Sequence, residues 1–292
     1  MLKALGRDVR IRLLRAALRC PVCRAAMRPD GEFRSVLCAN GHNFDIARSG
    51  YINFISRLPK NPYGKELFAA RRRIIAESGV FSALHGAVGL ALGKFADLSR
   101  GLALLADLGC GEGSHLQKVL ENPEAPFMAG VGLDISKEGI RMAAGRYPDH
   151  LWLVGDLANT PLADGSFQAI LNILSPANYG EFRRMLSPGG IVIKAVPGPY
   201  YLGELREALF PAREKRNYRN DETVALFKSR FRLLDHIRVH DAVRLGLGGL
   251  HDLARMTPLA WRADRERLDA FLSREPREIT VELDILIGSP ER

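Results

Sequence analysis

A glycine-rich turn that follows a short apolar run constrains the fold of this chain more than any other feature. Residues 106–113 spell ADLGCGEG, which places glycines at Gly109, Gly111 and Gly113. The apolar run at 102–106 predicts a β-strand, and residues 114–120 predict a helix. Closely spaced glycines let the backbone turn tightly and approach a ligand at the carboxyl end of a strand. The turn therefore predicts a ligand-binding loop in an α/β fold.

Apolar runs and helical patterns alternate through most of the remaining chain. Strands are expected at 102–106, 129–133, 151–154, 169–173 and 191–195, and helices at 65–76, 81–95, 114–120 and 137–146. This rhythm predicts a mostly parallel sheet with helices on both faces. Closing strands are expected at 231–234 and 279–286, and alternation in the second predicts an antiparallel, half-exposed strand.

Three aspartates follow three successive predicted strands, at Asp107, Asp134 and Asp156. A carboxylate before the first glycine disfavours a phosphate ligand and suits the cationic amino-acid end of S-adenosylmethionine. Asp134 stands where a ribose diol would lie, and Asp156, followed by Leu157, where an adenine amino group would lie. Each aspartate alone also reads as a helix cap or turn residue. Together with the glycine turn they resemble the cofactor site of class I, Rossmann-like methyltransferases, and so favour an α/β domain of that class.

Cys20, Cys23, Cys38 and His42 form the second chemical motif. Two pairs at this spacing predict two knuckles that hold tetrahedral zinc in a closed, structural Cys3His site. A redox role for the Cys20/Cys23 pair is the alternative, but no thioredoxin-like pattern surrounds it. Cys110 is expected only to pack within its loop. The nearby arginines indicate either a phosphate-attracting surface or an ordinary solvated face; they are Arg19, Arg24, Arg28, Arg34 and Arg48.

The chain is basic, with 42 Lys and Arg against 33 Asp and Glu and a formal charge of +9. This balance favours a polyanionic partner, although organism-wide composition produces it too. Residues 1–19 read as a short basic arm, or as dispensable residues after an upstream start codon, and not as a secretory signal. A turn-rich joint at 61–64 separates a predicted basic arm and zinc-binding domain at 1–58 from a methyltransferase domain at 59–292. No apolar run is long enough to predict a membrane-spanning helix.

Together these motifs resemble the 23S rRNA guanine-N1-methyltransferase family, which includes enzymes of tylosin-type macrolide resistance. The resemblance runs from Cys20 onward and includes the segments GHNFD at 41–45, GYINF at 50–54, ARRR at 70–73, PGP at 197–199 and MTPLAWR at 256–262. It implies a zinc domain that helps to grip a hairpin of 23S rRNA and a catalytic domain that is often a homodimer; the few cysteines at metal-like spacing separately predict a reducing, cytoplasmic location. It also implies cofactor contacts from Phe81, Gly113, Ser114 and Tyr201.

Residues 172–179, after the fourth predicted strand, stand where such enzymes meet their target base. Asn172 is expected to hydrogen-bond the base and Tyr179 to stack on it; a plain loop with an Asn cap is the alternative. No general base is assigned. The predicted RNA surface comprises Arg71, Arg72, Arg73, Arg183, Arg184, Arg213, Lys215 and Arg216.

Three other functions fit parts of the pattern. A methyltransferase acting on a small molecule or on a protein would share the catalytic domain, and a non-catalytic RNA-binding module would retain only a relic of the cofactor pocket. The intact acidic and glycine positions favour an enzyme over the relic. Which guanine is modified, and whether the role is housekeeping or resistance, stays open at this point.

Overall fold

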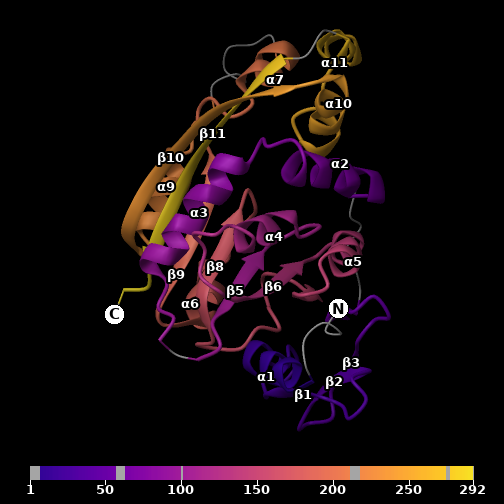
Figure 1. Ribbon diagram of the computed structural model, residues 1–292, viewed down its shortest axis with the longest axis vertical. Coiled ribbons are helices and arrows are strands. Elements are labelled where there is room, and N and C mark those ends of the chain that lie inside the picture. Colours follow the sequence, from indigo (N-terminus) through magenta and orange to yellow (C-terminus); the bar gives the residue numbers. More distant parts are fainter. Residues whose placement is uncertain (1–6, 57–62, 100, 211–217, 274–276, 292) are drawn as a thin grey trace.

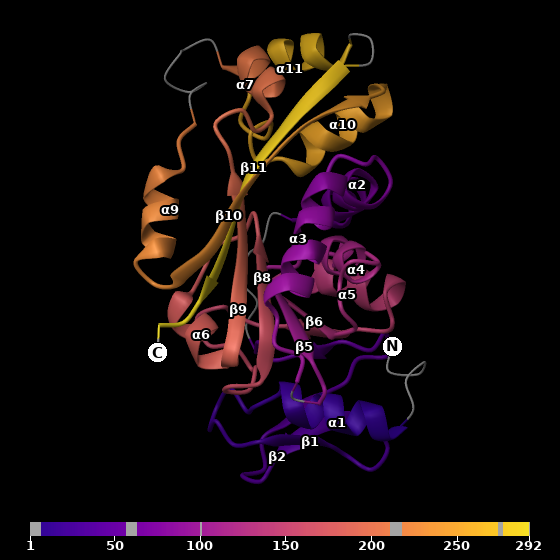
Figure 2. The same ribbon diagram turned by 60° about the vertical axis from the view of Figure 1, so that its left-hand side comes forward.

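The protein consists of a small N-terminal unit at one end of a large sheet that carries helices on both faces. The computed structural model describes residues 7–56, 63–99, 101–210, 218–273 and 277–291. The N-terminal unit lies below the sheet in Figure 1, while α7, α10 and α11 lie at the opposite end (Figures 1 and 2). This arrangement confirms the predicted α/β class. No helix in the described part of the chain is long and apolar enough to cross a membrane.

The central sheet has eight strands in the order β10-β11-β9-β8-β5-β6-β7-β4. Its strands are β4 (Ile52–Asn53), β5 (Leu104–Leu108), β6 (Ala129–Asp134), β7 (Leu151–Val154), β8 (Phe167–Ile173), β9 (Leu186–Pro197), β10 (Arg232–Leu245) and β11 (Arg277–Ser289). All neighbours from β4 to β9 pair in parallel, and β11 runs antiparallel to both of its neighbours. The loops after β5, β6, β7 and β8 therefore meet at one edge of the sheet, where open α/β sheets bind ligands.

Two apolar cores lie on the two faces of this sheet. The first core includes side chains of seven helices: α2 (Lys65–Ala76), α3 (Ser82–Phe95), α4 (Ser114–Leu120), α5 (Lys137–Arg146), α7 (Gly203–Leu209), α10 (Leu247–Met256) and α11 (Arg265–Leu272). The second includes side chains of α1 (Arg7–Ala17), α6 (Tyr179–Met185) and α9 (Asp221–Lys228). Strand β5 serves both cores, since Leu105 enters the first while Leu104 and Ala106 enter the second. Successive strand residues point to opposite faces, and this alternation produces the division.

The closing strands differ from the prediction in exposure. Strand β11 is antiparallel as expected, yet nearly all of it is buried, because α3 and α7 contact it together with α9. The half-exposed alternation belongs to β10 instead, which forms the sheet edge. The sequence pattern of 279–286 was misleading because its two charged members, Glu282 and Asp284, are buried and paired with histidine and arginine side chains of β10.

The N-terminal segment is not a dispensable arm in this structure. Leu14 and Ala17 of α1 are completely buried in the second core, and Leu18 forms an antiparallel bridge with Leu162. Residues 155–166, which connect β7 to β8, contain no helix. A helix in such a parallel crossover would normally cover the sheet. Helix α1 covers that face instead, and the expectation of a short basic arm, or of dispensable residues, is corrected for residues 7–19.

The cysteine-containing segment folds into a three-stranded antiparallel sheet of β1 (Met27–Pro29), β2 (Ser35–Cys38) and β3 (Asn43–Asp45). It is joined directly to the large sheet, because the next strand, β4, pairs with β7 through Ile52 and Leu153. The predicted boundary between residues 58 and 59 lies outside the described residues. The division into two domains therefore stays a prediction.

Candidate active site and metal centre

The predicted ligand loop follows β5 and enters α4, as the sequence indicated. Gly109 and Gly113 have φ angles of 84° and 82°, a backbone region that side chains rarely tolerate. A Cβ atom at Gly109 would lie 1.8 Å from Oγ of Ser175, and one at Gly113 would lie 2.3 Å from the Trp152 ring. Glycine is therefore required both by the turn and by the closeness of its neighbours.

Asp134, at the end of β6, is fixed by the loop. Its two carboxylate oxygens accept hydrogen bonds from the backbone N–H groups of Gly111 and Ser136, both at 2.8 Å. Burial raises the pKa of Asp134, although these two bonds and Arg71 act against the rise. The carboxylate thus lies beside the glycine turn in a fixed orientation, as a ribose-binding acid requires.

Asp107, the last residue but one of β5, is buried with only 2% exposure. Its Oδ2 atom has no hydrogen-bond partner, an uncommon condition for a buried carboxylate. Burial raises the pKa of Asp107 to about 7, and the nearby Arg71 opposes this effect. An orphaned acidic oxygen beside a glycine loop fits a ligand that brings its own positive donor, such as the ammonium group of S-adenosylmethionine.

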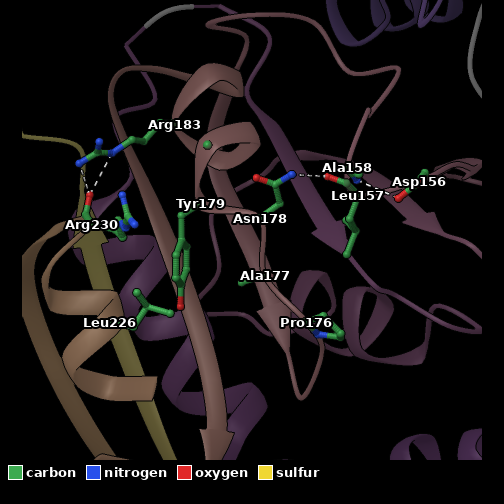
Figure 3. Close-up of a pocket in the computed structure, with 11 residues that line it drawn as sticks. Asp156, Leu157, Ala158, Pro176, Ala177, Asn178, Tyr179, Arg183, Leu226 and Arg230 are labelled. Carbon is green, nitrogen blue, oxygen red and sulfur yellow. Dashed lines mark hydrogen bonds between the residues drawn. The ribbon is translucent and has the colours of Figure 1, made fainter. Parts of the chain in front are cut away.

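Asp156 and Leu157 follow β7 at the rim of a pocket of about 600 Å³. Asp156 is exposed and accepts a hydrogen bond from the N–H of Ala158 at 2.8 Å, so it also acts as a turn residue. The pocket opens between this turn, the start of α6 and α9 (Figure 3). Its lining combines a tyrosine, two arginines and apolar groups: Asp156, Leu157, Ala158, Pro176, Ala177, Asn178, Tyr179, Gly180, Arg183, Leu226 and Arg230.

Three further residues that were predicted to contact the cofactor are buried. Phe81 packs edge-on against the His115 ring at 5.0 Å, and Ser114 shares a 2.9 Å hydrogen bond with the Tyr147 hydroxyl. Tyr201 is 8% exposed, and burial raises its pKa to about 12. Their contacts with a cofactor remain predictions.

Asn172 lies at the end of β8 and is completely buried. Its amide nitrogen donates to the carbonyls of Leu108 and Pro176, both at 2.9 Å, and thereby ties the loops after β5 and β8 together. Its Oδ1 accepts from the Lys194 ammonium at 2.5 Å. These contacts position the loop; direct contact of Asn172 with a target base remains a prediction.

Lys194 was missed in the sequence, although a lysine within the apolar run 191–195 was a visible signal. It lies on β9 with 4% exposure, and burial lowers its pKa to about 8. Besides Asn172, it donates to the Ser175 carbonyl at 3.1 Å. Leu174, between these acceptors, has a φ of 51°. A strained backbone held by buried hydrogen bonds is typical of functional loops.

Tyr179 is half-buried, in the pocket wall rather than in solvent. Its ring makes edge contacts with Phe182, Phe227 and Phe231 at centroid distances of 5.7 to 6.1 Å. Burial raises the pKa of its hydroxyl group. These contacts hold the ring at the pocket wall. The stacking of Tyr179 on a target base remains a prediction.

The predicted RNA surface needs correction. Arg71 points into the protein toward Glu112, Arg72 pairs with Glu77, and the Arg73 guanidinium binds both oxygens of Asp252. Consecutive residues on a helix diverge by about 100°, so three adjacent arginines cannot share one surface.

Arg184 also faces inward, where Glu181 and Asp164 accept its hydrogen bonds. Of the rest of that predicted surface, Arg183 lines the pocket, and Arg213, Lys215 and Arg216 lie outside the described residues. The arginines of the N-terminal unit divide similarly. Arg24, Arg28, Arg34 and Arg48 are exposed, whereas Arg19 is buried and bonds Asp164 at 2.6 Å.

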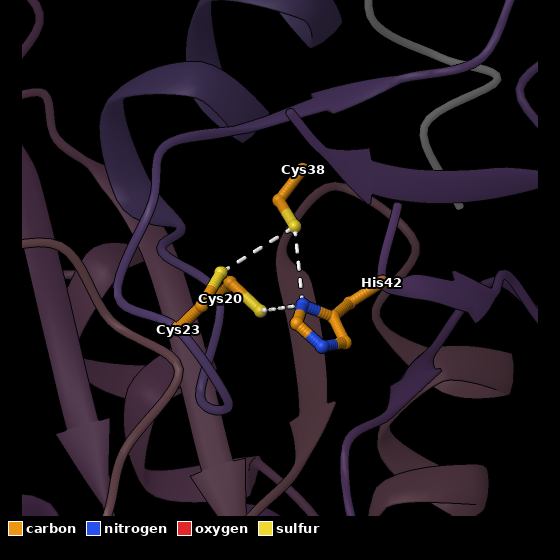
Figure 4. Close-up of side chains that lie close together, drawn as sticks. All are labelled: Cys20, Cys23, Cys38 and His42. Atoms are coloured by element: carbon orange, nitrogen blue, oxygen red, sulfur yellow. Dashed lines mark hydrogen bonds between the residues drawn. The ribbon is translucent and has the colours of Figure 1, made fainter. Parts of the chain in front are cut away.

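The metal centre is formed as predicted, with the ligand atoms of Cys20, Cys23, Cys38 and His42 all within 4.8 Å of one another (Figure 4). Sγ of Cys23 lies 3.6 Å from Sγ of Cys38, and Nδ1 of His42 lies 3.4 Å from Sγ of Cys38. Tetrahedral zinc would set these separations at about 3.8 and about 3.6 Å. A hydrogen bond from the Ala25 backbone lowers the pKa of Cys23 to about 6 and so favours the thiolate that zinc binds. The geometry fits a closed, four-ligand zinc site.

Comparisons with known proteins agree with both halves of this geometry. Residues 18–59 match the family model described as RlmA, N-terminal, a zinc ribbon, and residues 105–190 match a methyltransferase domain. The chain is 32% identical to the 23S rRNA (guanine(748)-N(1))-methyltransferase of Streptomyces fradiae over 94% of this chain and 96% of that protein. It is 39% identical to YxjB of Bacillus subtilis (strain 168), which is named for 23S rRNA guanine-N1 methylation, over 92% of this chain and 96% of the relative. The chain belongs to the 23S rRNA (guanine-N1)-methyltransferase family.

Membership in this methyltransferase family identifies the two groups that the protein binds. The methyltransferase domain uses S-adenosylmethionine, and the Cys3His cluster of the zinc ribbon fits a structural zinc ion; the binding of the cofactor by the glycine loop, Asp107 and Asp134 remains a prediction. A third relative, from Micromonospora griseorubida, is 32% identical over 90% of this chain and carries the same kind of name. The resemblance inferred from the motifs is thereby confirmed.

Proposed function

We propose that this enzyme transfers the methyl group of S-adenosylmethionine to N1 of a guanine in 23S rRNA. The observation that carries the proposal is the joining, in one chain, of a buried acidic cofactor loop with a zinc ribbon that matches the RlmA model. The names of the full-length relatives support the same substrate. Four exposed arginines on the N-terminal unit supply positive charge for RNA phosphates.

The protein contributes to the reaction by aligning the cofactor with the guanine and by excluding water from the site. The bound cofactor supplies an electrophilic methyl group on sulfonium. Asp107 and Asp134 would hold its amino-acid and ribose parts, and Asn172 ties the loop after β8 to the end of β5 at the same sheet edge. Alignment of guanine N1 with the methyl group lowers the activation barrier for methyl transfer, and the enzyme itself supplies no nucleophile. The guanine N1 proton leaves as the new bond forms, and we assign no general base.

We place the target nucleotide at the pocket of about 600 Å³ beside Tyr179. The half-buried ring offers a surface for an unstacked base. Arg183 and Arg230 line the same pocket and can bind the phosphates of the nucleotide. Methylation at N1 needs the base unpaired, so a hairpin loop or a flipped nucleotide is the proposed form of the substrate. We further propose a cytoplasmic homodimer with an N-terminal zinc domain and a C-terminal catalytic domain; light scattering tests the dimer.

Analysis of large-subunit RNA from a deletion strain tests the proposal. Digestion and mass spectrometry should show the loss of one N1-methylguanosine, which also identifies the guanine and so separates resistance from housekeeping sites. Complementation with the wild-type gene should restore it, whereas an Asp134→Asn variant should not. Unchanged N1-methylguanosine in the deletion strain would refute the proposed function. Cofactor turnover without rRNA would instead support a small-molecule or protein substrate.

A further inference from the structure

The guanidinium of Arg71 reaches the cofactor loop from α2, more than thirty residues before that loop. Its Nη1 atom donates to Oε2 of Glu112 at 2.6 Å and to the carbonyl of Cys110 at 3.3 Å. A Cβ atom at Gly111 would lie 2.2 Å from the same nitrogen. The absence of a side chain at residue 111 is therefore what admits the guanidinium to the loop.

The surroundings of Arg71 are strongly acidic. Burial opposes its charge, but the carboxylates of Glu112, Asp134 and Asp107 raise its pKa. In the part of the chain that the structure describes, Arg71 is the one cation among the charged groups that act on Asp107. The Arg71 cation thus acts electrostatically on a buried carboxylate that has an orphaned oxygen, and it is bonded to the glycine turn itself.

We propose that Arg71 binds the α-carboxylate of S-adenosylmethionine, while Asp107 binds its α-ammonium. The amino-acid end of the cofactor is a zwitterion, and a buried carboxylate requires a charged partner to offset its desolvation. A guanidinium presents several donors in one plane, so it can bind a carboxylate and keep a bond to Glu112. The inference deepens the proposed function but rests only on the cofactor, not on the RNA substrate.

Glu112 is then a positioning residue. Its side chain is 1% exposed, and its Oε1 atom has no hydrogen-bond partner. One oxygen holds Arg71 at the loop before the cofactor arrives, which reduces the side-chain entropy lost on binding. The alternative is that the Arg71–Glu112 pair only connects α2 to the loop and never meets the cofactor.

Calorimetry with two ligands separates these alternatives. The probes are S-adenosylmethionine and decarboxylated S-adenosylmethionine, which differ only by the carboxylate. Wild-type protein should bind the decarboxylated compound roughly 10- to 100-fold more weakly, the range expected for one charge-assisted contact. In Arg71→Met the two ligands should bind within about twofold of each other, because the residue that recognises the carboxylate is gone. Arg72→Met, which loses only its pair with Glu77, is the matched control and should retain the wild-type difference.

Equal binding of the two ligands by wild-type protein would overturn the inference, and so would an unchanged difference in Arg71→Met. The wild-type comparison stands even if the variant does not fold, which thermal unfolding would reveal. Failure of wild-type protein to bind S-adenosylmethionine itself would overturn the cofactor site as well. A protein that shows the ligand difference but does not methylate rRNA would refute the proposed substrate and leave this inference intact.

Discussion

The Lys194 ammonium donates a 2.5 Å hydrogen bond to Oδ1 of Asn172, and both side chains are buried beneath the loop that follows β8. Because Asn172 bonds Leu108 in turn, a lysine on β9 supports the end of the strand that carries Asp107. This chain of contacts connects the proposed base-binding side of the site with the cofactor side.

Lys194→Met should lower the rate of methyl transfer by roughly 10- to 100-fold, because a displaced loop would no longer align the target base with the cofactor. Cofactor affinity should change less than about threefold, because Asp134 and its backbone bonds are untouched. Single-turnover methylation and calorimetry measure the two effects separately. Asn172→Ala combined with Lys194→Met should be little worse than either change alone, as expected for coupled residues. Additive losses would show that the two act independently.

Cofactor binding should depend on pH through Asp107, whose pKa is raised by burial to about 7. Below that pH the free protein holds this carboxyl group protonated, and an ammonium ligand must displace the proton. Affinity should therefore rise with pH, by roughly tenfold per unit between about pH 5 and about pH 7. Asp107→Asn should bind weakly and lose this slope, whereas the exposed Asp156→Asn should keep it. A wild-type affinity that is flat across the range would contradict the prediction.

Removal of zinc should destabilise the N-terminal unit, because the metal joins the two knuckles that carry Cys20, Cys23, Cys38 and His42. Cys23→Ser should lose stoichiometric zinc, measured by elemental mass spectrometry, and lower the melting temperature. The control is Cys110→Ala, since Cys110 lies in the cofactor loop outside the cluster and this variant should keep one zinc ion per chain. A Cys23→Ser protein with full zinc content would show that Cys23 is not a ligand.

Leu14→Ala in α1 should destabilise the protein by about 2–5 kcal/mol, since the side chain is fully buried against the central sheet. Chemical denaturation followed by tryptophan fluorescence measures the loss, because Trp152 lies in the same sheet. Arg12→Ala, an exposed change on the same helix, should alter the free energy of unfolding by less than about 0.5 kcal/mol. Equal stabilities of the two variants would mean that α1 is not part of the fold.

Local patterns predicted much of this fold correctly. Helices α4 and α5 begin and end at the predicted residues, and the strand of 102–106 was misplaced by only two positions. The zinc cluster was predictable because its ligands lie within 23 positions of one another. The acids at the strand ends were predictable because a parallel sheet brings the carboxyl ends of its strands together.

Contacts between distant segments were not predictable in this way. Three adjacent arginines gave no sign that Arg71 alone turns toward Gly111, because the direction depends on how α2 packs over a loop forty residues later. Helix α1 was misread for the same reason, since its buried residues share the second core with residues as distant along the chain as Leu162. Lys194 is different. The sequence shows a lysine within a predicted buried strand, but it does not show which groups accept the hydrogen bonds of that lysine.

The docking of α1 also sets an order of events during synthesis. Arg19 and its partner Asp164 stand 145 positions apart, so the helix leaves the ribosome long before the surface that receives it. At about 5–20 residues per second, the delay is roughly 7–30 s. During that interval the apolar side of α1, including Leu13 and Leu14, must stay exposed or be shielded by another protein. A ribosome-bound chaperone therefore has a defined opportunity to bind the first helix of this enzyme.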